Sequence, residues 1–173
     1  IIDSRLILTL ENDRIRYHVE NMTPVRKCYQ QDQIDPGNYQ ENPNQTIFFA
    51  YMDRQLAGQI ILRKNWNNFA YVEDIVVDLK FRRRGVGKAL ILQAKKWARE
   101  RRLAGIMLET QNNNVGACKL YEHCGFQIAG LDRLLYKGLH PETYEIALYW
   151  YWLFEPLPPN PAHTIDELPW VTE

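Results

Sequence analysis

The chain has 173 residues, of which 46% are hydrophobic and 24% charged, as in one globular domain with an ordinary core. Its 21 Lys and Arg residues balance its 21 Asp and Glu residues, and a net charge of zero argues against bulk affinity for nucleic acid. There is no signal peptide and no apolar run near the roughly 18 residues of a membrane span, so we expect a cytoplasmic protein without a membrane partner.

The hydrophobic pattern predicts a single domain over residues 1–155 and a Pro-rich tail over residues 156–173. A polar segment at residues 23–44 should hold one or two short helices. The other expected elements, in chain order, are strands at 15–19, 46–52, 56–62 and 71–77, a helix at 85–102, a strand at 105–110, a helix at 115–124, and strands at 126–129 and 145–154. This order predicts an α/β (α+β) fold with a mixed sheet and a parallel β-α-β core.

A basic, glycine-containing loop joins the strand at 71–77 to the helix that follows it: Arg82-Arg83-Arg84-Gly85-Val86-Gly87-Lys88. The first N–H groups of a helix lack partners and carry partial positive charge, and glycines let an anion approach the backbone, so this order predicts a phosphate site. A P-loop is excluded because Arg82 stands where its first Gly is needed and Ala89 follows Lys88. The dinucleotide pattern is excluded by Leu90 in place of its third Gly. The remaining pattern is Arg-x-x-Gly-x-Gly, which by itself also fits a solvated basic helix start.

A second motif begins about thirty residues further on. Asn114 is a suitable N-cap for the helix at 115–124, and Gly125 is a suitable C′ residue. Asn114 and Tyr121 are seven residues apart, about two helical turns, so they lie near one line of the helix surface.

Together, the Arg82-x-x-Gly85-x-Gly87 loop and the Asn114-to-Tyr121 helix with Gly125-Phe126 resemble the motifs of the GNAT superfamily, the acetyl-CoA-dependent N-acyltransferases. The resemblance covers about residues 14–154 and implies a GNAT fold, whose mixed central sheet is splayed between its fourth and fifth strands and flanked by helices. It implies acetyl-CoA bound through its pyrophosphate at the loop, an Asn114 contact to pantetheine, and a Tyr121 hydroxyl near the thioester sulfur. The cofactor-binding residues it implies are Ile75, Val76, Val77, Arg82, Arg83, Arg84, Gly85, Val86, Gly87, Lys88, Asn114, Ala117, Lys119 and Tyr121.

Four segments look more particularly like the streptothricin acetyltransferases, which acetylate the β-lysine amine of an antibiotic: residues 71–77, 108–115, 117–126 and 147–152. The implied partner is a small-molecule amine. Within the same enzyme class, a protein or ribosomal-protein N-acetyltransferase is the alternative. A non-catalytic CoA-binding sensor and a basic nucleic-acid-binding helix are alternatives of other classes, and the neutral net charge counts against the latter.

The chemistry of amine acylation indicates which side chains to expect. A lysine-like amine has a pKa of about 10.4 and must lose a proton before it attacks. Glu73, Asp74 and Glu109 are the candidate bases, ranked in that order, and Tyr121 is the candidate proton donor to the departing thiolate. Strand alternation puts Glu73 and Asp74 on opposite faces unless a bulge intervenes. The expected substrate-binding residues are Glu73, Asp74, Trp66, Tyr149 and Trp150.

The cysteines and histidines predict no metal site. Three cysteines, Cys28, Cys118 and Cys124, lack ligand spacing and are interpreted as free thiols, and the four His residues show no ligand pattern either. The alternating Tyr and Trp residues at 149–152 should present one side to the core. For the other side a substrate contact and a homodimer interface both remain open.

Overall fold

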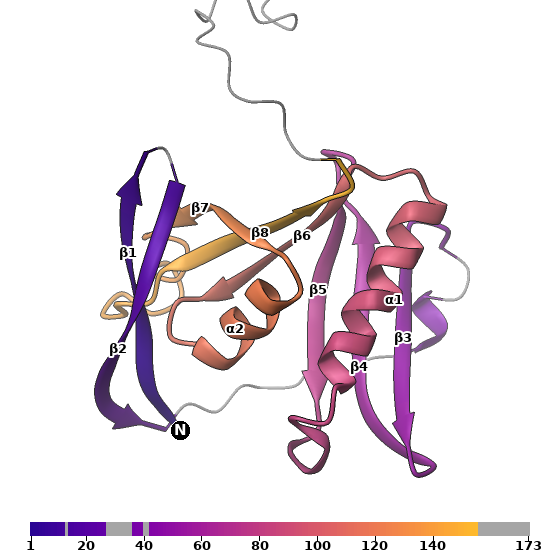
Figure 1. Cartoon of the computed structure of the whole chain (residues 1–173), viewed down its shortest axis with the longest axis horizontal. Coiled ribbons are helices and arrows are strands. Elements are labelled where there is room, and N and C mark those ends of the chain that lie inside the picture. The colour runs from indigo at the N-terminus through magenta and orange to yellow at the C-terminus, as the bar shows by residue number, and fades with distance from the viewer. Residues whose placement is uncertain (13, 27–35, 40–41, 156–173) are drawn as a thin grey trace, which may run out of the picture.

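The computed structural model describes residues 1–12, 14–26, 36–39 and 42–155 (Figure 1). The expected tail at 156–173, Cys28 and much of the polar segment at 23–44 lie outside the described residues. The described elements are β1 (Ile2–Glu11), β2 (Arg14–Val25), η1 (Pro36–Tyr39), β3 (Gln45–Met52), β4 (Gln55–Lys64), β5 (Ala70–Val77), η2 (Leu79–Phe81), α1 (Val86–Glu100), β6 (Gly105–Gln111), α2 (Val115–His123), β7 (Gln127–Asp132) and β8 (Ala147–Leu153).

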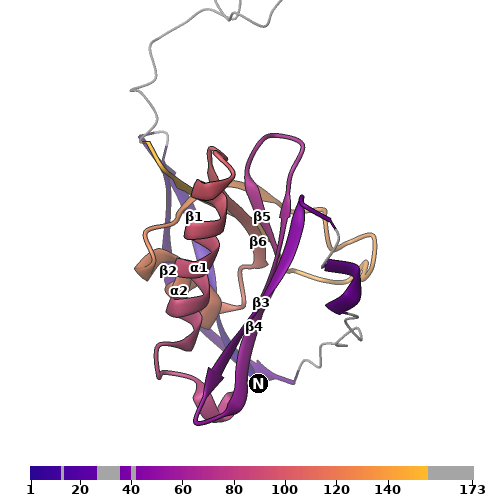
Figure 2. The same cartoon turned by 90° about the vertical axis from the view of Figure 1, so that its right-hand side faces the viewer.

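A mixed six-stranded sheet forms the centre of the molecule, in the order β3-β4-β5-β6-β8-β7. The β5–β6 pair is parallel and is connected through α1, whereas the other neighbouring strands run antiparallel. The predicted mixed sheet with a parallel β-α-β core is thereby confirmed. Both α-helices cover one face of this sheet, and η1 and the β7–β8 connection lie on the opposite side (Figure 2).

α1 packs on the sheet because its apolar residues recur on one side of the helix. These residues are Val86, Leu90, Ile91, Ala94, Trp97 and Ala98, all of which are buried. They meet the inward residues of β4, β5 and β6 in one core, which includes Leu62, Val72 and Leu108. No helix in the described part of the chain is both long and apolar enough to cross a membrane.

The sheet is splayed between β5 and β6, which are the fourth and fifth of the predicted strands. The register of this pair covers Ala70 to Val72 of β5 against Ile106 to Leu108 of β6. Beyond Val72 the two strands share no further pairs among the described residues, so the remaining edge of β5 borders a gap in the sheet. The gap opens toward α2, as Figure 1 shows.

An N-terminal hairpin, β1 with β2, forms a separate two-stranded sheet. The prediction of one short strand at 15–19 was wrong in extent and missed β1 altogether. Leu6 is the one fully buried residue of β1, and the strand's other side chains are partly or fully exposed. The strand therefore lacks the strong alternation by which a half-buried strand is recognised in a sequence.

Candidate active site

The basic loop before α1 leaves the start of that helix open to a ligand. Gly85 is the N-cap residue in a left-handed conformation (φ 86°), and no side chain caps the helix there. The first intrahelical bond runs from the N–H of Ala89 to the carbonyl of Gly85, so the N–H groups of the preceding helical residues have no intrahelical partner. Arg83 is also left-handed (φ 62°), a strained conformation that is uncommon outside glycine and often found at ligand sites.

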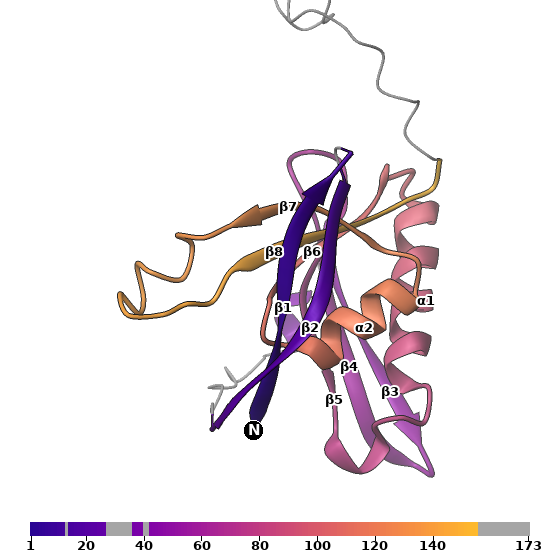
Figure 3. The ribbon, with the colours of Figure 1, turned by 60° about the vertical axis from the view of Figure 1, so that its left-hand side comes forward.

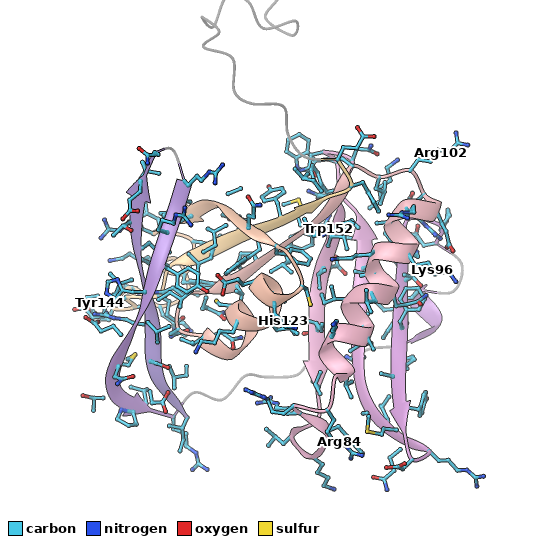
Figure 4. The ribbon with its side chains drawn as sticks, viewed as in Figure 1. Arg84, Lys96, Arg102, His123, Tyr144 and Trp152 are labelled. Atoms are coloured by element: carbon cyan, nitrogen blue, oxygen red, sulfur yellow. The ribbon has the colours of Figure 1, made fainter. Side chains whose placement is uncertain are left out.

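The two loop glycines have different surroundings, and both suit an anion cradle. A Cβ placed on Gly85 would meet no atom within 4 Å, so this residue faces open space. A Cβ on Gly87 would lie 2.9 Å from Leu120 Cδ2 of α2, the end of a flexible side chain that would have to shift to make room. Lys88 is exposed one residue further along, and Arg84 lies below the start of α1 (Figure 4). Open N–H groups, basic side chains and a glycine facing solvent fit a pyrophosphate.

Tyr121 is enclosed on the helix side of the sheet. α2 begins at Asn114, whose Oδ1 accepts from the N–H of Ala117, and ends before Gly125 (φ 85°), as predicted. The Tyr121 side chain is 4% exposed and packs between the rings of Phe126 and Trp150. Burial, and after it the nearby Cys118, Asp74 and Glu109, raise the pKa of the phenol well above its ordinary value. The hydroxyl is therefore protonated at neutral pH and able to donate.

A β-bulge in β5 decides the placement of the first two candidate bases. Ile61 pairs with Asp74 and Leu62 with Val72, so Glu73 is the extra residue. The Glu73 carboxylate lies 2.6 Å from the Arg63 guanidinium, and Gln59 donates to Asp74 at 3.4 Å. Because Gln59 and Arg63 are on the same face of β4, the two acids share the face away from the helices.

Glu109 lies on that same face, in the middle of β6. It pairs in register with Tyr149 of β8, and its carboxylate accepts a hydrogen bond from the hydroxyl of Tyr136. Burial raises the pKa of Glu109, the Tyr136 bond lowers it, and nearby Glu145 raises it again. The net effect is a raised pKa, which brings this carboxyl closer to neutral pH, where the pKa of an effective general base lies.

The site thus draws on both faces of the sheet at the splay. Tyr121 comes from the helix side, and Glu109 and Asp74 come from the opposite side. The charges of both carboxylates contribute to the raised pKa of Tyr121. A thioester lying in the gap between β5 and β6 would have a proton donor on one side and a proton acceptor on the other.

The three aromatic residues expected to bind the substrate lie in three different environments. Tyr149 is half-buried beside Glu109 on the acid-lined face. Trp150 is 1% exposed and packs in the core on the helix side, so the expected substrate contact is corrected to a packing role. Trp66 is 92% exposed on the turn between β4 and β5.

The structure adds residues that no sequence motif singled out. Arg63 neutralises Glu73 and lies over the ring of Tyr71, with its guanidinium carbon 4.6 Å from the ring centroid. Tyr136 belongs to the β7–β8 connection, for which the sequence predicts no element. Within the described residues, Cys118 and Cys124 are free, and no group of His, Cys, Asp and Glu could hold a metal ion.

Comparison with known proteins gives consistent matches. The chain matches the family described as Acetyltransferase (GNAT) family over residues 10–126. It is 37% identical to streptothricin acetyltransferase A of Bacillus subtilis (strain 168), over 89% of this chain and 88% of that protein. It is 40% identical to a streptothricin acetyltransferase of Escherichia coli, over 83% and 79% of the two chains. A Bacillus anthracis str. Ames protein solved in complex with acetyl coenzyme A superposes with a TM-score of 0.83 at 52% identity, over 88% and 87%.

Proposed function

The chain belongs to the GNAT family of acetyltransferases, and from this premise we propose that it acetylates a primary amine of a small cationic acceptor, the β-lysine amine of streptothricin-type antibiotics. The assignment of this acceptor rests on the match to streptothricin acetyltransferases along most of both chains. The carboxylates on the side of the splay away from the helices support a cationic acceptor.

The donor is acetyl-CoA, which supplies an activated thioester when bound. The open N-terminus of α1 and the basic residues of its loop would hold the pyrophosphate. The pantetheine arm would follow the free edge of β5, from Ile75 to Val77, toward Tyr121. Asn114 caps α2 with its side-chain oxygen Oδ1, so its side-chain nitrogen Nδ2 remains for the predicted pantetheine contact.

Glu109 is the base that this arrangement favours, in place of the sequence ranking that put Glu73 first. Glu73 is held in an ion pair with Arg63, so its carboxylate is already engaged by a cation of the protein. Glu109 is half-buried with a raised pKa, and its charge also raises the pKa of Tyr121. Asp74, on the same face, adds negative charge that attracts the acceptor.

Tyr121 completes the reaction on the helix side. Its protonated hydroxyl would donate to the sulfur of the departing thiolate, and Glu109 would take up the proton that the acceptor amine loses, from the other side. The backbone N–H groups on the free edge of β5 would donate hydrogen bonds to the thioester carbonyl oxygen as it gains negative charge.

The proposed acceptor is tested with purified protein, acetyl-CoA and a panel of streptothricin, aminoglycosides, polyamines and lysine peptides. We expect acetylated streptothricin, with the added mass on the β-lysine moiety by fragmentation mass spectrometry, and drug tolerance in cells that express the protein. Robust acetylation of a peptide lysine or N-terminus, with no product from streptothricin at high enzyme, would instead establish a protein acetyltransferase.

The choice of base is tested with three nearly isosteric variants. Glu109→Gln should lower kcat by about 10²- to 10⁴-fold and flatten the acidic limb of the pH–rate profile, because an amide takes up no proton. Glu73→Gln and Asp74→Asn should mainly raise KM for a cationic acceptor and weaken its salt dependence. A flattened limb in Glu73→Gln with a normal profile in Glu109→Gln would restore the original ranking.

A further inference from the structure

Tyr136 makes a contact that the reaction scheme above does not use. It lies in the connection between β7 and β8, residues 133–146, which projects from the sheet on the side away from the helices (Figure 3). Its hydroxyl donates to Oε1 of Glu109, a residue 27 positions earlier in the chain. A segment that lies beyond the end of the sheet thus reaches back to the proposed base.

The connection is folded in a way that fixes the backbone of Tyr136. Asp132 Oδ1 accepts from the N–H groups of Leu134 and Leu135, at 2.7 and 3.0 Å. The carbonyl of Tyr136 itself accepts from the N–H groups of Leu139 and His140, at 3.1 and 2.9 Å. The hydroxyl is therefore presented to Glu109 from a defined turn.

A second tether holds the far end of the same connection. Asn113, two residues after the end of β6, donates from Nδ2 to Glu145 Oε1 at 2.7 Å, and the Glu145 N–H donates to Thr143 Oγ1 at 3.2 Å. The connection is thus attached to β6 and the residues just after it at two separate points. One of these points is the proposed base, so the position of the connection and that of the carboxylate are linked.

We propose that Tyr136 is a positioning residue for the base: its hydroxyl fixes one oxygen of the Glu109 carboxylate and leaves the other oxygen for the acceptor amine. The proposal rests on the proposed function, because it concerns the same acceptor site. A glutamate side chain has three rotatable bonds, and a hydrogen bond to one oxygen removes much of that freedom before the acceptor arrives.

The charges around Glu109 predict the direction in which its pKa should change when the Tyr136 hydroxyl is removed. The ionisable groups that influence this carboxyl or are influenced by it come from β5, α2, β8 and the β7–β8 connection: Tyr71, Tyr121, Tyr149, Tyr136 and Glu145. Of these, Glu145 raises the pKa of Glu109, as burial does, and the bond from Tyr136 opposes both. Removal of that hydroxyl should therefore raise the pKa further.

Tyr136→Phe tests this role, with Tyr144→Phe as the matched control. Tyr144 is in the same connection but is 85% exposed, and it lies on the outer surface (Figure 4). In Tyr136→Phe the acidic limb of the kcat/KM profile for the acceptor should move to higher pH by about one unit, the worth of a hydrogen bond to a charged group. Activity should fall about tenfold below the limb and recover largely above it, whereas Tyr144→Phe should keep the wild-type profile. An equal loss at every pH would reduce Tyr136 to a loop-packing residue and overturn the proposal.

A double-variant cycle distinguishes loss of the Tyr136–Glu109 hydrogen bond from a general disturbance of the connection by Tyr136→Phe. In the Glu109→Gln background the added Tyr136→Phe change should alter kcat/KM by less than about twofold, because the group that it positions is already neutral. Additive losses of the two changes would contradict the proposal.

A measurement on the free protein, without an acceptor, tests the role of Tyr136 independently of the proposed function. Carboxyl carbon NMR of the free protein, labelled at glutamate, gives the pKa of Glu109 directly, with Glu109→Gln to assign the resonance. We expect a higher pKa in Tyr136→Phe than in the wild type. An unchanged pKa rejects the positioning role even if wild-type protein acetylates streptothricin. A raised pKa in a protein that acetylates none of the amines would leave the contact in place and reject the proposed function.

Discussion

Tyr121 is placed so that its hydroxyl can be removed without disturbing the core. Its ring centroid lies 6.0 Å from those of both Phe126 and Trp150, and a phenylalanine ring could make the same two ring contacts. Burial raises the pKa of the phenol, so it stays protonated over the whole range of a normal assay. The residue is therefore suited to donate to a departing thiolate at any of these pH values.

Tyr121→Phe should therefore lower kcat by about 10²- to 10⁴-fold while acetyl-CoA affinity stays within about twofold. Single-turnover kinetics measures the chemical step, and calorimetric titration measures the affinity. Tyr51→Phe, at a residue of β3 that is 67% exposed, is the matched control and should behave as wild type. A wild-type rate in Tyr121→Phe, with chemistry rate-limiting, would remove the hydroxyl from the mechanism.

Individual residues also mark the limit of what the sequence predicts. Tyr121 was predicted as a candidate site residue from the resemblance of its helix to the GNAT motif, and Glu109 from the need for a base and its strand position. The common face of Glu73 and Asp74 was not, because a single inserted residue reverses strand alternation and leaves no signature in the sequence. Tyr136 had no signal either, since its role comes from the folding of a long connection across the sheet.

Among the elements, the loop and α1 together have the features of an anion-binding unit. The loop residues Arg83 and Gly85 are both left-handed, and the helix that follows starts without a side-chain cap. In contrast, α2 is capped by its own Asn114. Of the two helices, α1 has the free N-terminus, and it is the one preceded by basic residues.

Gly85→Asp should weaken CoA binding at least about tenfold, or roughly 1.4 kcal/mol, because it places a carboxylate against the pyrophosphate. Gly85→Ala is the matched control: it carries at least as much left-handed strain without the charge, and its Cβ meets no atom within 4 Å. Calorimetric titration with CoA should give a clearly larger loss for Asp than for Ala. Gly87→Asp is less informative, since a Cβ there also presses on Leu120. Wild-type affinity in Gly85→Asp would show that the pyrophosphate binds elsewhere.

Elements with a strong period or clear caps were predicted closely. The helices α1 and α2 and the strands β5 and β6 lie within two residues of their expected bounds. β1 was missed because its side chains, apart from Leu6, are partly or fully exposed on both faces and show no strong alternation. The hairpin forms through long-range contacts, which no local pattern reports.

In the whole molecule, Asn112 joins three parts of the chain. It is 3% exposed, and its side chain donates to the Leu6 carbonyl at 3.1 Å and accepts from the Ile146 N–H at 3.0 Å. Its backbone bonds the same two residues: the Leu6 N–H donates to its carbonyl, and its own N–H donates to the Ile146 carbonyl. The N-terminal hairpin, the end of β6 and the approach to β8 are thus connected at one buried amide.

Asn112→Ala should therefore destabilise the fold by about 2–4 kcal/mol, since it leaves the buried Leu6 carbonyl and the partly buried Ile146 N–H each short of a partner. Urea unfolding measures this change, and Asn21→Ala, at an exposed residue of β2, is the control expected to stay within about 0.5 kcal/mol. Hydrogen exchange adds the spatial test, because the loss should fall first on the hairpin: amides of β1 and β2 should exchange faster, while those of α1 change less. Equal acceleration in α1 and the hairpin would mean that the hairpin opens only with the whole domain and that Asn112 does not hold it separately.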